Sequence, residues 1–332
     1  MSRASTDSLH LPTIEDYLGP ATTRYFGDGH KRTRHHLHTI TLSPAMPCTI
    51  TATAAVDYPS DWSRKDQIDQ PPHLSTIDVI ILAVRLAEIH LTQHDGLSPH
   101  QLASAWLCDA RIKAGNTPVQ QELAAFDVLA HLSEREHADE PGRELSTWHC
   151  RIGSLTATIM INHPRPDHLH TGTPEPHPIW NPHHGPFGTG VADRGQHLAD
   201  IHLRPDHQQA HAHQITFNAT GMAAEPGEGL EGLYQPAISV IDLFVAVLQL
   251  GQVMLYQLDG IDRDTSHTLW MRRTHIIAGP PRAHTAQPFT LLASLFNTQL
   301  LQTRTGETWR RADITSYTDD GMVRCSVAHQ LP

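Results

Sequence analysis

Two aspartates, Asp78 and Asp242, each follow a serine by three residues, at Ser75 and Ser239. This spacing is that of a capping box, in which the serine and the acid satisfy the free N–H groups that begin a helix. A carboxylate held at a helix start can also act as a general base on an attacking hydroxyl, with the serine orienting the substrate. The pairs are therefore candidates for helix caps and for catalytic groups alike.

His73 lies five residues before Asp78, and the second copy has Ala237 at the matching place. A histidine whose pKa lies near neutrality is a suitable proton acceptor. This asymmetry favours the first copy as the active one, although a surface histidine is also expected in so histidine-rich a chain.

Three cations are candidates for substrate binding. Lys31 follows two glycines that flank Asp28, a pattern typical of a turn whose backbone can approach a phosphate or phosphopantetheine. Arg272 and Arg273 are adjacent in a strand-like stretch, so they point to opposite faces and one of them can reach a cleft.

The chain contains 27 histidines, and 11 of them lie between His163 and His213. Paired imidazoles of this kind can bind zinc or iron. The segment carries no familiar metal-binding motif, however, and much of it is rich in proline. We predict a solvated connection and no metal site, with a metal-dependent enzyme as the rival hypothesis.

Composition excludes several classes of protein. A formal charge of −11 argues against nucleic-acid binding. Four widely spaced cysteines favour a reducing cytoplasm over a disulfide framework, and residues 1–19 hold no apolar core of signal-peptide length. Residues 238–258 are apolar but contain three glutamines, so we expect a buried helix and no membrane association.

An internal repeat organises the sequence. Residues 72–115 align without gaps on residues 236–279 at a constant offset of 164, with 13 identities in 44 positions. Each copy predicts a capped apolar helix of about 18 residues that ends at Asp-Gly.

Strand-like stretches surround each predicted helix. We expect strands in residues 37–42, 48–56, 102–114, 144–152, 155–161, 214–219, 268–278, 289–303, 309–317 and 322–328, with 119–131 ambiguous between helix and strand but favoured as strand.

A long apolar helix followed by antiparallel strands, occurring twice, resembles a double hotdog, an α+β fold in which each curled sheet wraps a central helix. Many hotdog acyl-thioester enzymes carry Pro-Gly and a glutamate at this helix start; here PHLSTID (72–78) and PAISVID (236–242) keep the proline and an acid but lack the glycine. The resemblance implies that the acid faces an acyl-thioester tunnel. The expected organisation is an N-terminal segment (1–34) across the pair, repeat 1 (35–162), a connection (163–195) and repeat 2 (196–332).

The strings IEDYLGP (14–20), RYFGDG (24–29), QLDGI (257–261) and TLWMRR (268–273) resemble the AvrD family, whose members direct synthesis of syringolide-type acyl glycolipids. The resemblance implies an enzyme that joins a β-ketoacyl thioester to a sugar or triose-like polyol, with later cyclisation to a lactone or glycolipid. The hotdog proteins of butyrolactone signal synthesis (AfsA type) perform a similar joining.

The resemblance implies no cofactor, because the acyl carrier protein or CoA thioester is itself the substrate. A hotdog thioester hydrolase or hydratase, and a non-catalytic acyl-binding protein, are the alternatives. Two hotdogs in one chain already form the minimal pair, so a monomer and a homodimer are both expected states.

Overall fold

The computed structural model describes residues 8–43, 48–65, 68–115, 117–166, 184–219, 227–282, 288–319 and 321–332. Its α-helices are α1 (Glu15–Leu18), α2 (Thr76–Gln93), α3 (Pro99–Ala103) and α4 (Val240–Asp259). The strands of the first half are β1 (Leu9–Thr13), β2 (Arg34–Ser43), β3 (Thr49–Asp57), β4 (Arg64–Lys65), β5 (Ile68–Asp69), β6 (Trp106–Lys113), β7 (Phe126–His137), β8 (Arg143–Ile152) and β9 (Leu155–Pro164). Those of the second half are β10 (Arg194–Leu203), β11 (Gln209–Ala219), β12 (Trp270–Ala278), β13 (Phe289–Gln302), β14 (Thr308–Thr318) and β15 (Gly321–Gln330).

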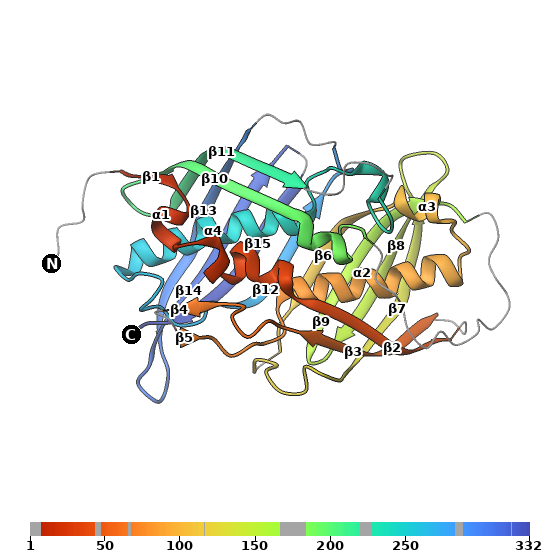
Figure 1. Ribbon diagram of the computed structural model, residues 1–332, viewed down its shortest axis with the longest axis horizontal. Helices are drawn as coiled ribbons and strands as arrows, with labels where there is room; N and C mark the ends of the chain where they lie inside the picture. Colours follow the sequence, from red (N-terminus) through yellow and green to blue (C-terminus); the bar gives the residue numbers. More distant parts are fainter. Residues whose placement is uncertain are drawn as a thin grey trace.

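Two six-stranded sheets of identical order form one continuous sheet. The first half runs β2-β3-β7-β8-β9-β6 and the second half runs β10-β11-β13-β14-β15-β12, with every neighbouring pair antiparallel. Each sheet packs around one long helix, α2 in the first half and α4 in the second (Figure 1). This arrangement is a double hotdog, as the sequence predicts.

The two halves join through β6 and β12. In this antiparallel pair Arg111 lies directly opposite His275, and the two are related by the same offset of 164 residues that relates the helices. The pairing therefore places a local pseudo-twofold axis between the repeats, and it brings the starts of both copies' structural elements into comparable surroundings.

Both central helices form for the reasons that the sequence indicates. Ser75 and Ser239 are N-caps, and each completes a capping box with the aspartate three residues later. Nearly all of α2 and α4 is buried, so apolar side chains on every face are matched by strands or loops on every side. The helix α4 is long and apolar enough to cross a membrane, but 83% of that stretch is buried inside the protein.

Several boundaries differ from the prediction. Strand β10 is not among the predicted strands, and its first two residues fall in the predicted connection. The sequence does not indicate this strand because its polar side chains alternate with only four buried apolar ones. Residues 99–103 form α3 ahead of β6, and β7 starts only at Phe126. Gly260 caps α4 in the left-handed conformation, whereas α2 ends three residues before Gly96.

The N-terminal segment contacts both halves. Strand β1 pairs with β10 at the edge of the second sheet. Residues 14–32 then form α1 and short helical turns that contact α4 and reach the start of α2, where the Tyr25 hydroxyl bonds Ser75 Oγ.

Candidate functional site

The start of α2 holds a fully buried carboxylate. Asp78 accepts hydrogen bonds from the Ser75 backbone N–H at 2.7 Å and from the Tyr58 hydroxyl. The Nε2 atom of His35 lies 2.7 Å from the other carboxylate oxygen. The hotdog resemblance implies that this acid faces a tunnel. Asp78 is 0% exposed, however, so it does not face a cavity directly. Its oxygens instead hold Ser75, Tyr58 and His35 in place.

These contacts determine the protonation of Asp78. Burial raises the pKa of this carboxyl, but the hydrogen bond and charge of His35, with the bonds from Ser75 and Tyr58, outweigh burial and lower the pKa overall. The group is therefore a carboxylate at neutral pH.

The start of α4 is built differently. Arg194, the first residue of β10, donates from Nε to both oxygens of Asp242 at 3.0 and 2.8 Å, and its Nη2 also bonds that carboxylate. Burial raises the pKa of Asp242, but the charge of Arg194 outweighs burial and lowers it. Asp242 is thus the acid of a buried ion pair, and Ser239 is its capping partner at 2% exposure.

Two adjoining cavities lie at the start of α2, between the repeats. The larger, about 260 Å³, is mostly apolar, and its wall includes Leu74, Leu155, Leu269, Trp270 and Trp309. The smaller, about 70 Å³, has three cationic side chains in its wall. His73, Ser75, Leu269 and Met271 line both, so the cavities meet beside the N-terminus of α2.

His73 is the titratable side chain at this junction. Its ring lies between two indoles, with centroids 5.1 Å from Trp62 and 5.0 Å from Trp270. Burial lowers the pKa of His73, opposed by a hydrogen bond to the Pro71 backbone and by the charge of Asp78. The imidazole is therefore neutral at pH 7, and a ring that donates one N–H to a carbonyl keeps its other nitrogen as a proton acceptor.

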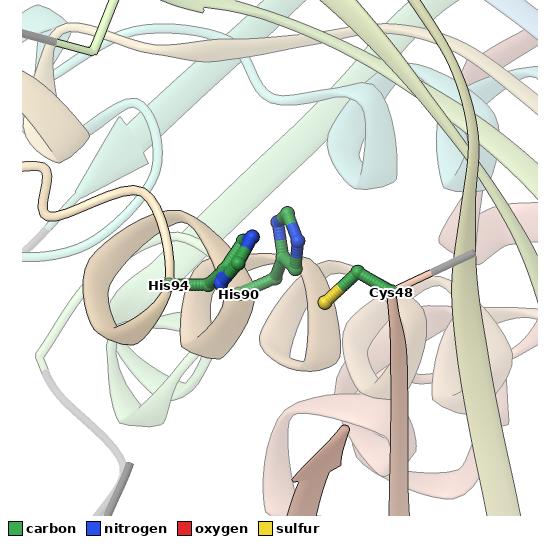
Figure 2. A group of neighbouring side chains, drawn as sticks. All are labelled: Cys48, His90 and His94. Atoms are coloured by element: carbon green, nitrogen blue, oxygen red, sulfur yellow. The ribbon is translucent and has the colours of Figure 1, made fainter. Parts of the chain in front are cut away.

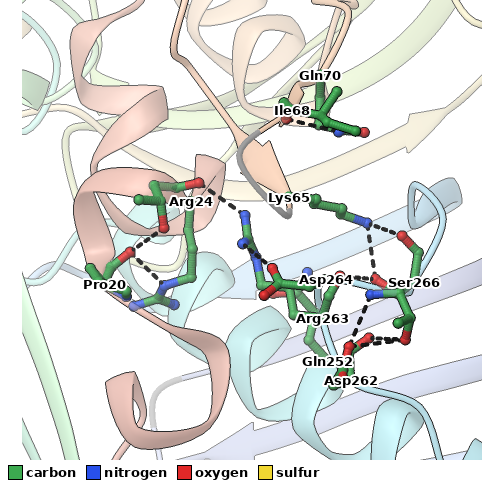
Figure 3. Close-up of polar contacts among 12 residues, drawn as sticks. Pro20, Arg24, Lys65, Ile68, Gln70, Gln252, Asp262, Arg263, Asp264 and Ser266 are labelled. Atoms are coloured by element: carbon green, nitrogen blue, oxygen red, sulfur yellow. Dashed lines mark hydrogen bonds and ion pairs between the residues drawn. The ribbon is translucent and has the colours of Figure 1, made fainter.

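Three half- to fully buried cations line the smaller cavity: Arg24, Lys65 and Arg263. Lys65 Nζ bonds only neutral oxygens among the described residues, the Ser266 carbonyl and hydroxyl and the His267 carbonyl, at 2.8 to 3.0 Å. Arg263 donates to the Thr23 carbonyl at 2.9 Å, and Figure 3 shows the polar contacts of Arg24, Lys65 and Arg263.

Burial lowers the pKa of Lys65 to about 8 and that of Arg24 to about 10. Arg24 has an acidic partner, since Glu15 lies 3.0 Å from it. Lys65 has no such ion-pair partner among the described residues, although the charge of Asp264 partly opposes the lowering of its pKa, so an incoming anion would gain a direct ion pair. Arg24, Lys65 and Arg263 were not expected as binding residues; the scarcity of lysine, with three in the chain, is the one signal that could have found Lys65.

The three cations that the sequence analysis predicts for substrate binding either lie outside these two cavities or donate to a neighbouring backbone carbonyl. Lys31 donates to Asp28 at 2.6 Å and lines a separate cavity of about 40 Å³. Arg272 lines the larger cavity and donates to the Gly115 carbonyl at 2.9 Å, whereas Arg273 is exposed beside Lys113. A bulge between Met271 and Arg273 breaks the expected alternation.

The histidine-rich stretch is only partly within the described residues. His168, His170, His177 and His183 lie outside them. The ring of His184 contacts Asp193 at 3.1 Å, and His202 contacts Asp200 at 2.9 Å, both on the surface.

The whole chain can now be compared with known proteins. The family model of the Pseudomonas avirulence D protein (AvrD) matches residues 10–332. The chain belongs to the AvrD family. The AvrD match spans the N-terminal segment and both repeats, which confirms the resemblance of the N-terminal and C-terminal strings. No curated protein sequence matches this chain.

Solved structures with similar folds share little sequence with this AvrD-family chain. The tesB protein of Mycobacterium avium subs paratuberculosis has 8% identity, covering 88% of this chain and 96% of its own, with a TM-score of 0.39. A protein with hot dog fold from Alicyclobacillus acidocaldarius has 8% identity, 93% and 99% coverage and a TM-score of 0.37. An acyl-ACP thioesterase from Bacteroides thetaiotaomicron has 14% identity, 79% and 92% coverage and a TM-score of 0.36. The fold assignment rests on the strand order and central helices of the chain itself.

Proposed function

We propose that this protein transfers a β-ketoacyl group from a thioester to a hydroxyl of a sugar or triose-like polyol, as an enzyme of secondary-metabolite or signal-molecule synthesis. The observation that carries the proposal is the meeting of an apolar cavity and a cationic cavity at His73 and Ser75. A substrate with an apolar chain, a reactive carbonyl and a charged group has these three parts in that order. Family membership favours the same chemistry.

The apolar cavity suits the acyl chain. Its wall is mostly aliphatic and aromatic, and Trp309 adds a buried indole Nε1 without a hydrogen-bond partner among the described residues.

The cationic cavity suits a phosphate. Lys65, Arg24 and Arg263 offer charged donors that phosphate oxygens bind strongly. A phosphate is present on the phosphopantetheine of an acyl carrier protein, on CoA and on a phosphorylated acceptor. The thioester and the acceptor therefore compete as its source, and the experiments below separate them.

The reaction is placed at the junction. His73 takes the proton of the acceptor hydroxyl while that oxygen attacks the thioester carbonyl carbon. The carbon–sulfur bond breaks, an ester forms, and the proton passes to the departing thiolate. Cyclisation of the ester product would follow as a later step. The first-turn N–H groups of α2, beside Thr76, lie at the positive end of the helix dipole and suit the oxyanion.

Asp78 and Ser75 complete the proposed site. Asp78 acts as a positioning residue, because its carboxylate and the His73 carbonyl, which lies 2.9 Å from the Tyr58 oxygen, share the single O–H of Tyr58 as donor. Ser75 Oγ lies at the cavity junction and bonds the Tyr25 hydroxyl, which fits an orienting role toward substrate.

The test is acyl transfer by the purified chain. With a β-ketoacyl thioester and a polyol, wild type should form the ester, and His73→Gln should lower kcat about 10² to 10⁴-fold. The acid limb of kcat/KM should lie below pH 6.5, because burial lowers the pKa of His73. His100→Gln, on exposed α3, is the matched control and should retain wild-type activity.

Three results would overturn the proposal. Free acid formed equally with and without polyol would mark a hydrolase, and binding of acyl thioester without turnover would mark an acyl-binding protein. Full activity in a folded His73→Gln protein would remove the assigned base.

A further inference from the structure

A second cluster of chemically capable side chains lies at the opposite end of α2. Cys48 precedes β3, and His90 and His94 lie one turn apart on the last part of the helix (Figure 2). The thiol sulfur and one ring nitrogen of each histidine all lie within 4.8 Å of one another. By helix rise, His90 is about 18 Å from Asp78, so this cluster is separate from the cavities described above.

The cluster contains polar atoms that lack partners. His90 is 0% exposed, and neither ring nitrogen has a hydrogen-bond partner among the described residues. The Nδ1 atom of His94 and the Oδ1 atom of Asp95 are likewise buried without one. Asp95 Oδ2 lies 3.6 Å from His90 Nδ1, beyond hydrogen-bond distance. Each such group costs about 1–3 kcal/mol unless something binds it.

The second repeat shows that the fold does not require these histidines. At the offset of 164 residues, His90 corresponds to Met254 and His94 to Leu258, while the aspartate after them is kept as Asp259. Met254 is fully buried in the core around α4. Apolar packing thus suffices at this place in one copy, and the other copy has two imidazoles and a thiol.

The protonation states suit metal ligands. Burial, with smaller contributions from His94, Arg135 and His163, lowers the pKa of His90 to about 3. The imidazole is therefore neutral, the form that binds metals. Burial raises the pKa of the Cys48 thiol to about 11, and a bound cation would convert it to the thiolate.

We propose that Cys48, His90 and His94 bind a zinc ion. One thiolate and two imidazoles are ligands that zinc prefers, and i, i+4 histidines on one helix face converge on a single ion. No carboxylate oxygen of the described residues lies within 4.8 Å of all three ligand atoms, so a water molecule would supply the fourth ligand. The ion would have a structural role, because it links the start of β3 to the end of α2. This inference is independent of the proposed acyl transfer.

The test uses the full-length chain without a histidine tag. After incubation with zinc chloride and desalting over a chelating resin, wild type should retain about one zinc per chain by elemental analysis. The same protein loaded with Co²⁺ should show a thiolate-to-cobalt charge-transfer band, which Cys48→Ser should abolish.

Two variants control for folding and for adventitious binding. His90→Met with His94→Leu introduces the residues of the second repeat, so it should fold, lose the zinc and lose the zinc-dependent rise in Tm. His10→Ala with His202→Ala removes an exposed histidine pair near Asp200 and should keep zinc as wild type does. Wild type without retained zinc, an equal zinc content in the Met/Leu variant, or no cobalt–thiolate band would each overturn the proposal.

Discussion

The central helices of the two repeats begin with the same four-residue capping box, but the side chains that contact its acid differ between the repeats. At α2, Asp78 is held by Tyr58 and His35, which are not permanent cations. At α4, Asp242 forms a buried ion pair with Arg194. The capping box is therefore a property of each helix, whereas the function of its acid depends on what the neighbouring strands and loops bring to it.

The difference extends to the space in front of the helices. His73 and Ser75 open onto two cavities at α2, and Lys65, which donates hydrogen bonds to neutral oxygens, lines the smaller one. At the matching position of α4, Ala237 is 2% exposed and its carbonyl accepts from Arg194. One copy thus has the features of a reaction site, and the other has the features of a buried structural joint.

The largest expected effect is the loss of stability when the buried ion pair of Asp242 and Arg194 is broken. Asp242→Asn leaves the guanidinium of Arg194 buried without its carboxylate and should lower the free energy of unfolding by roughly 3 kcal/mol. Asp78→Asn removes no partner of a permanent cation and should cost about 1–2 kcal/mol. Urea denaturation of both variants measures the difference.

The same two variants should show the reverse order in kinetics. Asp78→Asn should lower kcat at least about tenfold with little change in KM, because Tyr58 and His73 lose their positioning. Asp242→Asn should keep wild-type kcat per folded molecule. Equal kcat losses, or a larger stability loss in Asp78→Asn, would contradict the assignment of roles to the two repeats.

A smaller effect is expected from Lys65, whose charge has only neutral partners among the described residues. Lys65→Met should raise KM about tenfold for whichever substrate carries the phosphate. Comparing a CoA thioester with a phosphate-free thioester, and a phosphorylated acceptor with its free polyol, identifies that substrate. Lys113→Met, at an exposed position at the end of β6, is the control, and an unchanged KM in every arm of Lys65→Met would exclude a phosphate site there.

The effect that is smallest at neutral pH, and grows only as pH falls, concerns the ends of β9 and β15. His329 contacts the Asp259 carboxylate at 3.0 Å, whereas His163 bonds Ser146 Oγ and the Pro164 carbonyl and no carboxylate of the described residues. Burial, with Arg135 and Arg143 nearby, lowers the pKa of His163 to about 4. In the unfolded chain His163 therefore binds a proton near pH 6.5, whereas in the folded chain it stays neutral at that pH.

Stability that is present above pH 6.5 should accordingly be lost as pH falls toward 4, by up to about 1.4 kcal/mol per pH unit from this one group. His163→Gln should reduce the slope of unfolding free energy against pH in that window. An unchanged slope would show that His163 is not the proton-linked group.

Much of the fold could be predicted from residues whose neighbours in sequence decide their structure. The capping boxes at Ser75 and Ser239, the apolar run of α4 and the alternation of β8 each depend on local spacing. Strand β10 escaped prediction because its polar residues mask the alternation, and the bulge before Arg273 could not be foreseen from strand periodicity.

The candidate site was predicted only in part. His73 and Ser75 were chosen from their place before Asp78, and both line the cavities. His35, Tyr58, Lys65 and Arg263 come from four other segments, and nothing local to them indicates a shared location. Close approach of residues so distant in sequence depends on how the strands pair and which loops cover the helix.

The sequence by itself determined the duplication, the two capped helices and their apolar burial, since these follow from periodicity and short-range hydrogen bonding. Only the tertiary structure decided which of the two acids stands beside a cavity and which forms an ion pair with an arginine. It also decided where Cys48 approaches the histidines of α2. The physical reason is that charge, burial and cavity shape depend on atoms brought together by folding, whereas helix caps depend on residues three apart.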